Sequence, residues 1–261
     1  MTRILFLGDI FARTGRRLVR ELVPPLFKEL ELDLALANGE NAAGGRGLTS
    51  STALELLACG LSALSGGNHT FRQRDILNII DHDPRLIRPA NYPSPCPGRG
   101  WTLLKTGDTS IGFGNLMGRI FMTPILQCPF KAADQMINEM QQAGAQETII
   151  DIHAEATSEK KALAFHLDGR IGALLGTHTH VQTADCQILP GGTAYITDVG
   201  MTGAHYSVIG MAHQEVVDNF LTARPRSFRP SESGGRLEGV LLEFNEHHKV
   251  RLIQPVTKNL N

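Results

Sequence analysis

The most constraining feature of this sequence is a short apolar run that recurs along the chain and ends each time in glycine or polar residues. The pattern is found at residues 4–7, 34–37, 61–64, 148–152 and 171–175. Runs of this length and ending are typical of buried strands in a mostly parallel sheet or in a sandwich. We therefore expect each run to form a buried strand.

Stretches with helical spacing lie between these runs, at residues 17–30, 51–59, 73–80 and 132–142. In the first stretch a leucine recurs every fourth residue from Leu18 to Leu30, which places these side chains on one face of a helix. Pro24 and Pro25 are expected to break or kink that helix. The alternation of strand and helix signals predicts an α/β architecture.

The C-terminal part of the chain has a different pattern. Residues 192–198 and 237–244 are predicted strands and residues 250–255 are their predicted partner, which suggests antiparallel strands that complete a second sheet. Residues 224–235 are rich in Arg, Pro, Ser and Gly, and we expect a mobile loop there. Together these patterns predict an α/β fold built as a four-layer α/β/β/α sandwich, with two mixed sheets flanked by helices.

The overall composition is that of an ordinary globular protein. A length of 261 residues fits one domain, residues 1–261, with or without a small cap formed by inserted loops. The hydrophobic fraction is 42% and the formal net charge is -1, so no global field draws the chain to nucleic acid or to an anionic membrane. This balance argues against a dedicated DNA-binding protein.

Cysteine usage and hydropathy predict the compartment. The four cysteines are scattered and form no CxxC motif, which suits a reducing environment. The apolar run at the N-terminus is too short for a signal peptide, and no segment approaches the roughly 20 apolar residues that cross a membrane. We expect a cytoplasmic protein without membrane association.

Polar residues with metal-binding side chains follow the predicted strands. They are Asp9, Glu40, Asn41, Asn68, His69, His153, His178 and His180. Taken alone, each is as well explained by a cap, a turn or a core histidine. Their recurrence at the carboxyl ends of successive strands, where α/β proteins bind ligands, favours a metal site instead. Carboxylate, amide and imidazole donors together suit Mn, Fe or Zn better than Mg alone.

The spacing of these residues suggests a pair of ions. His178 and His180 are two residues apart, so in an extended segment both rings point to one side, and each could bind a different ion. A carboxylate such as Glu40 can bridge two cations that lie about 3.5–4 Å apart, the arrangement that clamps a phosphoryl group. Glycines beside these residues allow tight turns and close backbone approach.

The series Gly8-Asp9, Gly39-Glu40-Asn41, Gly67-Asn68-His69, His153 and Gly176-Thr177-His178-Thr179-His180 resembles the calcineurin-like metallophosphoesterase superfamily. Residues 37–45, 88–93, 153–160 and 177–185 resemble a bacterial branch similar to 2′,3′-cyclic nucleotide phosphodiesterases. The resemblance covers nearly the whole chain and implies the same layered, metallophosphoesterase-like fold.

Two departures from the superfamily pattern affect the metal site. The first motif usually reads Asp-x-His, but Phe11 stands here at the histidine position, and Glu40 replaces the usual bridging Asp. The resemblance implies that Asn41 fills the vacated position. The implied ligand sets are Asp9, Glu40, Asn41 and His180 for one metal, and Glu40, Asn68, His153 and His178 for the other. An amide in place of an imidazole is expected to lower affinity or change metal preference at the first site.

The expected chemistry is hydrolysis with two divalent or mixed-valence metal ions, such as Fe, Mn or Zn. A hydroxide that bridges the metals would attack phosphorus, and His69 would protonate the leaving oxygen as general acid. The alternative role for His69 is to orient one of the metal ligands without contacting the substrate. Lys160, Arg119 and His205 could hold substrate, but their spacing does not require it.

The expected function is that of a phosphodiesterase acting on a small-molecule phosphodiester, such as a cyclic nucleotide, with RNA as a further candidate partner. A phosphomonoesterase acting on nucleotides or phosphoproteins is an alternative, because the same metal pair supports both reactions. A metal-containing regulatory or nucleotide-binding protein with poor turnover is another. A homo-oligomer is expected in each case.

Overall fold

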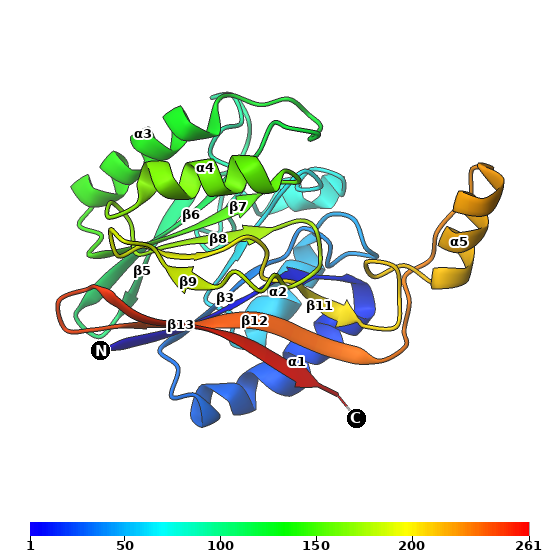
Figure 1. Cartoon of the computed structure of the whole chain (residues 1–261), viewed down its shortest axis with the longest axis horizontal. Helices are drawn as coiled ribbons and strands as arrows, with labels where there is room; N and C mark the ends of the chain where they lie inside the picture. The colour runs from blue at the N-terminus through cyan, green and yellow to red at the C-terminus, as the bar shows by residue number, and fades with distance from the viewer. Residues whose placement is uncertain (261) are drawn as a thin grey trace.

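The computed structural model describes residues 1–260 and consists of two mixed β-sheets packed face to face, with helices on both outer faces (Figure 1). The first sheet has the order β2 (Asp9–Ile10), β11 (Met201–Ala204), β12 (Gly235–Phe244), β1 (Thr2–Leu7), β3 (Leu34–Asn38) and β4 (Ala63–Ser65), with β13 (Val250–Asn259) paired to β12. The second has the order β5 (Trp101–Thr106), β6 (Thr109–Met117), β7 (Glu147–His153), β8 (Ala173–Thr177), β10 (Ala194–Ile196) and β9 (Gln187–Ile188).

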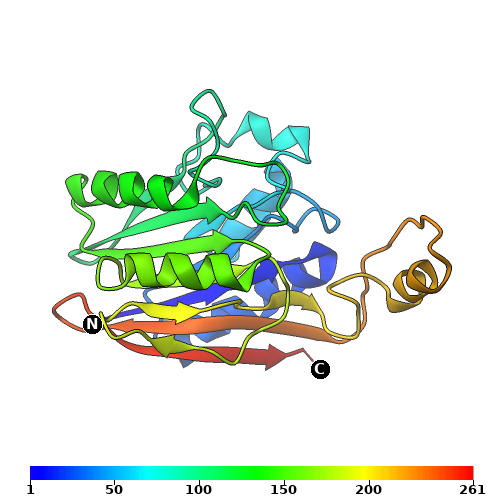
Figure 2. The same ribbon diagram turned by 45° about the horizontal axis from the view of Figure 1, so that its top comes forward.

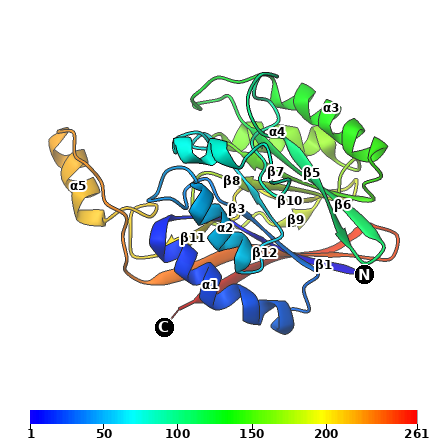
Figure 3. The ribbon, with the colours of Figure 1, turned by 180° about the vertical axis from the view of Figure 1, so that it is seen from behind.

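The helices belong to separate layers. Those beside the first sheet are α1 (Ala12–Glu29) and α2 (Ser50–Ala58), and those beside the second are α3 (Pro129–Gln142) and α4 (Thr157–Leu167). A short 3-10 helix, η1 (Arg74–Asn78), and the outlying α5 (His213–Thr222) complete the elements. Figure 3 shows α1 and α2 on one side and α3 and α4 on the other, with α5 projecting from the body. The predicted α/β/β/α sandwich is therefore confirmed.

Alternate side chains of a strand point to opposite faces of its sheet, so a single strand can contribute to two hydrophobic clusters. In β1, Ile4 and Phe6 pack between the sheets, whereas Leu5 and Leu7 face α1 and α2. Across the central core the Phe6 ring meets Phe113 of β6 edge to face, with ring centroids 6.1 Å apart. Because both faces of such a strand are buried, residues 4–7 are all apolar and no alternation with polar residues is seen there.

The neighbouring strands β1, β3 and β4 are parallel, and so are β6, β7, β8 and β10. Their carboxyl ends reach the same edge of the sandwich (Figure 2). The loops that follow these strands, where the polar motifs lie, are therefore brought together.

Two expectations about elements are wrong. Helix α1 runs through Pro24 and Pro25 without a break. Both prolines are exposed, and the carbonyls that lose a donor belong to the exposed residues Arg20 and Glu21, where water can replace it. The C-terminal strands also do not all lie antiparallel in one sheet: β12 and β13 join the first sheet antiparallel, whereas β10 joins the second sheet parallel to β8.

The segment from residue 223 to residue 234 lies between α5 and β12 and holds no helix or named strand. Its mobility stays a prediction. Within residues 1–260, none of the helices combines the length and the apolar character that crossing a bilayer requires.

Candidate metal centre

All of the predicted site residues lie at the shared carboxyl edge of the two sheets. The loops after β1, β3 and β4 supply one part of them, and β7 with the loop after β8 supplies the rest. Direct contacts join Asp9, Glu40, Asn41, Asn68, His69, His153, His178 and His180 into one cluster.

One set of contacts links Asp9, Asn41 and His180. The buried Asp9 places Oδ1 3.6 Å from His180 Nε2, and the Asn41 amide nitrogen lies 3.2 Å from the same Nε2. His180 Nδ1 is 3.0 Å from the carbonyl oxygen of Ile209, so Nδ1 carries the proton and Nε2 presents a lone pair to the site. The Phe11 ring packs edge-on against His180 at 5.5 Å between centroids.

A second set is centred on His153. Its Nε2 lies 3.0 Å from Asn68 Oδ1, 3.0 Å from His178 Nδ1 and 3.2 Å from Glu40 Oε1. Single donor atoms of Glu40, His153 and His178 fall within 4.8 Å of one another, which makes these residues a candidate metal-binding group. The other nitrogen of His178, Nε2, lies 3.3 Å from a Glu155 carboxylate oxygen, which can accept a hydrogen bond from the Nε2–H. Nδ1 then keeps a lone pair for a cation.

Glu40 contacts His153 of the second set, precedes Asn41 of the first set in the chain, and fits a cation better than a protein donor. Its Oε2 accepts the His69 backbone N–H at 2.9 Å. Its Oε1 is buried and accepts no well-directed hydrogen bond from residues 1–260, although His153 Nε2 and His69 Nδ1 both lie 3.2 Å away. A buried carboxylate oxygen surrounded by imidazole nitrogens and left without a donor is what a metal ligand looks like.

The electrostatics of the cluster also favour positive charge. Burial by itself raises the pKa of Glu40, but the positive charge of nearby His153 holds that pKa well below its usual range. Burial lowers the pKa of His153, yet Glu40, Asp9 and Asp151 together raise it to about 9. Burial and the charge of His153 lower the pKa of His178 to about 3. The carboxylates of the cluster thus favour a positive charge on His153, whereas His178 stays neutral.

Sequence reasoning missed the buried carboxylate that supports His153. His153 Nδ1 lies 2.9 Å from Thr177 Oγ1, and that hydroxyl donates to Asp151 at 2.7 Å. Asp151 also accepts hydrogen bonds from Asn38 and Ser65, and burial raises its pKa to about 6. The signal was present, because Asp151 and His153 are two residues apart in β7 and therefore point to one side.

The expectation of an extended segment at His178 and His180 is wrong. Both residues have positive φ, at 103° and 65°, so a tight turn rather than a strand presents the two rings. Asp198 supports this turn by accepting the Thr179 N–H at 2.9 Å and by pairing with Lys160 at 3.0 Å. Lys160 is fully buried and also donates to the Thr177 carbonyl, so it supports the turn, and it does not line the pocket described below.

The Asn41 amide has an orientation that bears on its predicted role. Its nitrogen faces Asp9 and His180, whereas its oxygen lies 2.8 Å from His69 Nδ1. Metal ligation by this amide uses the oxygen, so it requires the nitrogen and oxygen to exchange places by rotation about the terminal side-chain bond. Asn41 is thus placed to act on both the cation and His69.

The cluster opens into a pocket of about 440 Å³. Apolar side chains make up a large part of its lining, namely Phe11, Ile209, Met211 and Phe228. The polar lining includes His69, Arg46 and Glu155. Neither Arg119 nor His205 lines this pocket in the part of the chain that is described. A pocket of this size, with metal-binding groups at its base, can admit a small phosphoester.

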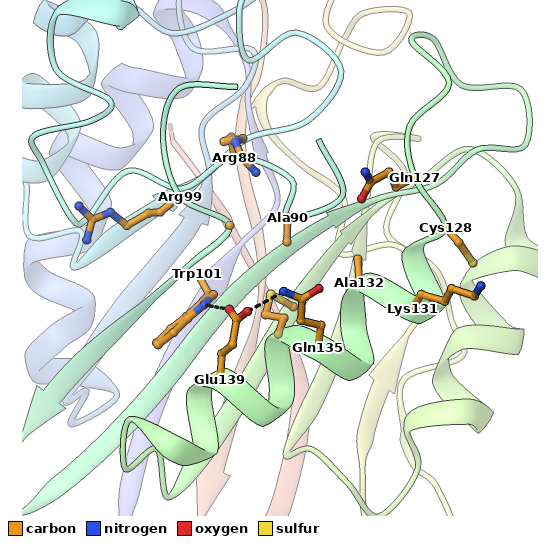
Figure 4. A pocket seen from close by; sticks show the side chains of 12 residues that line it. Arg88, Ala90, Arg99, Trp101, Gln127, Cys128, Lys131, Ala132, Gln135 and Glu139 are labelled. Atoms are coloured by element: carbon orange, nitrogen blue, oxygen red, sulfur yellow. Dashed lines mark hydrogen bonds between the residues drawn. The ribbon is translucent and has the colours of Figure 1, made fainter. Parts of the chain in front are cut away.

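A larger cavity of about 630 Å³ lies elsewhere, between α3 and the segment from Arg88 to Trp101 (Figure 4). Its carboxylate, Glu139, already accepts hydrogen bonds from Trp101 at 2.9 Å and from Gln135 at 2.8 Å. It contains none of the clustered residues.

A family model described as YmdB-like protein matches residues 5–256. The chain belongs to this family. A relative from Bacillus subtilis (strain 168), named 2′,3′-cyclic-nucleotide 2′-phosphodiesterase, is 45% identical over 250 residues, which cover 95% of this chain and 93% of the relative.

Solved structures agree with this assignment. A hypothetical protein from Thermus thermophilus is 41% identical, with a TM-score of 0.93 and 99% of both chains covered. A novel phosphatase from Mycoplasma pneumoniae is 32% identical, with a TM-score of 0.92, covering 99% of this chain and 93% of its own. The predicted metallophosphoesterase resemblance, the fold and the class of enzyme, a phosphoric ester hydrolase, are confirmed.

Proposed function

We propose that the chain is a dinuclear-metal phosphodiesterase that hydrolyses a small phosphodiester such as a cyclic nucleotide. The observation that carries this proposal is Glu40, whose buried Oε1 lacks a directed donor in a cluster that also holds two sets of candidate ligands. One set contains Asp9, Asn41 and His180, and the other contains Asn68, His153 and His178.

Each set together with Glu40 supplies four donors, and the mixture of carboxylate, amide and imidazole suits Fe, Mn or Zn. Two such cations, when bound, provide a hydroxide nucleophile near neutral pH and neutralise charge on the phosphoryl oxygens. The protein keeps its own ligands oriented through the Ile209 carbonyl behind His180, the Thr177–Asp151 pair behind His153, and Glu155 behind His178.

His69 is our proposed general acid. Its side chain is 25% exposed and lines the pocket, so it can reach a substrate. The Asn41 amide engages Nδ1 at 2.8 Å, through its oxygen as it stands or through its nitrogen once the amide turns to bind a cation, so Nε2 is the nitrogen left to protonate the leaving oxygen. The His69 backbone N–H to Glu40 fixes the start of the side chain relative to the metal-binding carboxylate.

The pocket supports a small substrate with an aromatic or apolar group. Its volume of about 440 Å³ lies within the roughly 300–1,000 Å³ that small-ligand sites occupy. Phe228, Ile209 and Met211 offer apolar surface on which a nucleobase could pack while its phosphodiester reaches the carboxylate cluster. The name of the Bacillus subtilis relative, a cyclic-nucleotide phosphodiesterase, agrees with this substrate class.

The decisive test measures metal content and hydrolysis in the same samples. Protein purified without a histidine tag would be assayed on a bis-aryl phosphodiester with Mn added, beside Asp9→Ala, and bound metals counted by elemental analysis. About two metals per chain with activity that disappears in Asp9→Ala supports the proposal. One metal or none, with no hydrolysis under any metal supplement, would refute it and favour a regulatory or nucleotide-binding protein.

A mono-aryl phosphate assayed in parallel separates the phosphodiesterase from the phosphomonoesterase alternative, since the preferred ester shows the reaction class. The expected homo-oligomer stays a prediction. Light scattering coupled to size-exclusion chromatography measures it directly.

A further inference from the structure

Helix α1 carries a line of four arginines that the proposed chemistry does not use. Arg13, Arg16, Arg17 and Arg20 are spaced i, i+3, i+4 and i+7, so they lie on one face of the helix. All four line a pocket of about 320 Å³, together with Thr14, Glu55 and Glu232. We call this set of four side chains the arginine stripe.

The stripe is electrostatically unfavourable for the helix that carries it. Like charges three and four residues apart destabilise a helix, and Arg13 lies in the first turn, where the helix dipole already disfavours a cation. The first turn of α1 has no acidic residue and no side-chain cap to offset this. Stability of the helix therefore does not explain the stripe.

The surrounding protein compensates only part of this charge. Glu55 of α2 lies 2.9 Å from Arg16 and 3.5 Å from Arg20. Within residues 1–260, neither Arg13 nor Arg17 has a carboxylate within 4.0 Å. Four guanidinium groups against the two carboxylates of the pocket leave a local excess of +2 on a chain whose net charge is -1. The stripe therefore offers an anion two guanidinium groups that no carboxylate of the described residues engages.

The stripe adjoins the metal pocket. Phe11 lines the metal pocket and Arg13 lines the stripe pocket, and two residues of chain span at most about 7 Å. Arg16 also donates to the carbonyl of Ala42, the neighbour of Asn41, at 2.6 Å. A ligand with one phosphate at the metal cluster can thus place further phosphates on the stripe.

We infer that the arginine stripe binds the phosphate backbone of a short single-stranded oligonucleotide whose terminal phosphodiester enters the metal pocket. The stripe extends over seven residues of helix, about 10 Å at 1.5 Å per residue, which is longer than one phosphate. Arginine suits phosphate because its planar fork donates two parallel hydrogen bonds. The inference goes beyond hydrolysis of a mononucleotide, and the binding itself is measurable without turnover.

The first experiment measures binding by fluorescence anisotropy. The metal-loaded enzyme is titrated into a fluorescein-labelled 2′-O-methyl RNA octamer with a 3′-phosphate, and the octamer is recovered afterwards to verify that it is intact. The double variant Arg13→Gln/Arg17→Gln is compared with Lys28→Gln/Lys161→Gln, which removes the same charge from positions outside the stripe. Glutamine is a good helix former, so α1 is expected to fold in the variant.

We expect the arginine variant to bind the octamer about tenfold or more weakly at low salt, and the lysine variant to stay near wild type. The slope of log K against log salt should fall by about 1.4, because each phosphate that is no longer neutralised on a single strand accounts for about 0.7. Equal affinity of the arginine variant and the wild type would overturn the inference. An equal decrease in both double variants would also overturn it, because a general field would then be responsible.

Glu55→Gln supplies a test of opposite sign. Removing this carboxylate frees Arg16 and Arg20, so the affinity for the octamer should rise several-fold. Unchanged or weaker binding would count against the stripe. Inorganic pyrophosphate is the competitor that separates ligand classes: displacement at the same concentration as unlabelled octamer would mean that a small anion, and not an oligonucleotide, is the ligand.

Hydrolysis then distinguishes this inference from the proposed function. The ratio of kcat/KM for an oligonucleotide ending in a 2′,3′-cyclic phosphate to that for the mononucleotide should fall in Arg13→Gln/Arg17→Gln. An unchanged ratio in an active enzyme refutes the stripe and leaves the phosphodiesterase in place. Stripe-dependent binding in an enzyme that hydrolyses no phosphodiester refutes the proposed function and leaves the stripe in place.

Discussion

Asn41 is the residue that the resemblance places in the position left by the usual imidazole ligand. Phe11 occupies the position of the usual imidazole ligand and packs against His180, with centroids 5.5 Å apart, so its ring supports a neighbouring ligand. The amide of Asn41 is left to complete the first set of donors, but it presents nitrogen to His180 and oxygen to His69. In the proposed dinuclear centre, the metal affinity of the first site therefore depends on how this amide turns.

Substitution of Asn41 tests that dependence. Asn41→Asp offers a charged oxygen in either orientation, so the first site should bind its cation more tightly than in the wild type. Asn41→Leu has a similar volume and no donor, and should lower the metal content from about two to about one per chain. Elemental analysis after dialysis measures both. Equal metal content in the two variants would show that Asn41 is not a ligand.

His69 makes a second prediction at this scale. His69→Ala removes the proposed proton donor but none of the proposed ligands, so turnover should fall by about 10²–10⁴-fold with the metal content close to wild type. Steady-state kinetics and elemental analysis of the same preparation check this. Loss of both metals in His69→Ala would instead assign His69 the role of orienting a ligand.

At the scale of elements, the turn after β8 depends on a buried ion pair beneath it. Lys160 of α4 and Asp198 are both fully buried and 3.0 Å apart, and together they hold the backbone of Thr177 and Thr179 on either side of His178. Because a left-handed backbone at His178 is unfavourable for a residue with a side chain, these contacts are needed to keep it.

Lys160→Met should therefore destabilise the fold. The change leaves Asp198 as an unpaired buried charge, which costs about 3–5 kcal/mol of unfolding free energy. The neighbouring Lys161 is exposed, and Lys161→Met is the matched control with an expected change within about 0.5 kcal/mol. Urea unfolding followed by circular dichroism measures both values. Similar stability of the two variants would contradict the role assigned to the ion pair.

At the scale of the whole molecule, the two sheets share one core. Side chains from β1 and β3 pack against those of β6, β7 and β8 in a single buried cluster. Within it, Phe6 of one sheet contacts Phe113 of the other. The proposed metal centre takes its candidate ligands from both sheets, so each half of the sandwich supplies only part of it. This arrangement supports the proposal that residues 1–261 form one domain.

One domain predicts one cooperative transition. Because the shared core would be exposed if either sheet unfolded alone, calorimetry should record a single unfolding peak, with equal calorimetric and van't Hoff enthalpies. Two separated peaks, or a calorimetric enthalpy well above the van't Hoff value, would show that the sheets unfold independently.

The sequence determined the strands and the ligand candidates, because both depend on local chemistry. An unbroken apolar run such as 4–7 needs burial on both faces, and polar side chains after such runs fall at the edge where parallel strands end. The order of the strands in the sheets did not follow from the sequence. Strand β12 lies beside β1 although the two are far apart in the chain, and only tertiary packing selects that neighbour.

Tertiary structure also decided how the predicted ligands are held. His178 and His180 point into the cluster through left-handed backbone, against the local preference of histidine, because Asp198 and Lys160 stabilise the turn from below. The spacing of the arginine stripe is visible in the sequence, but which arginines lack a carboxylate depends on where α2 places Glu55. Spacing along the chain fixes which side chains share a face, whereas the partners that compensate a buried or charged group come from distant segments that only the fold brings near.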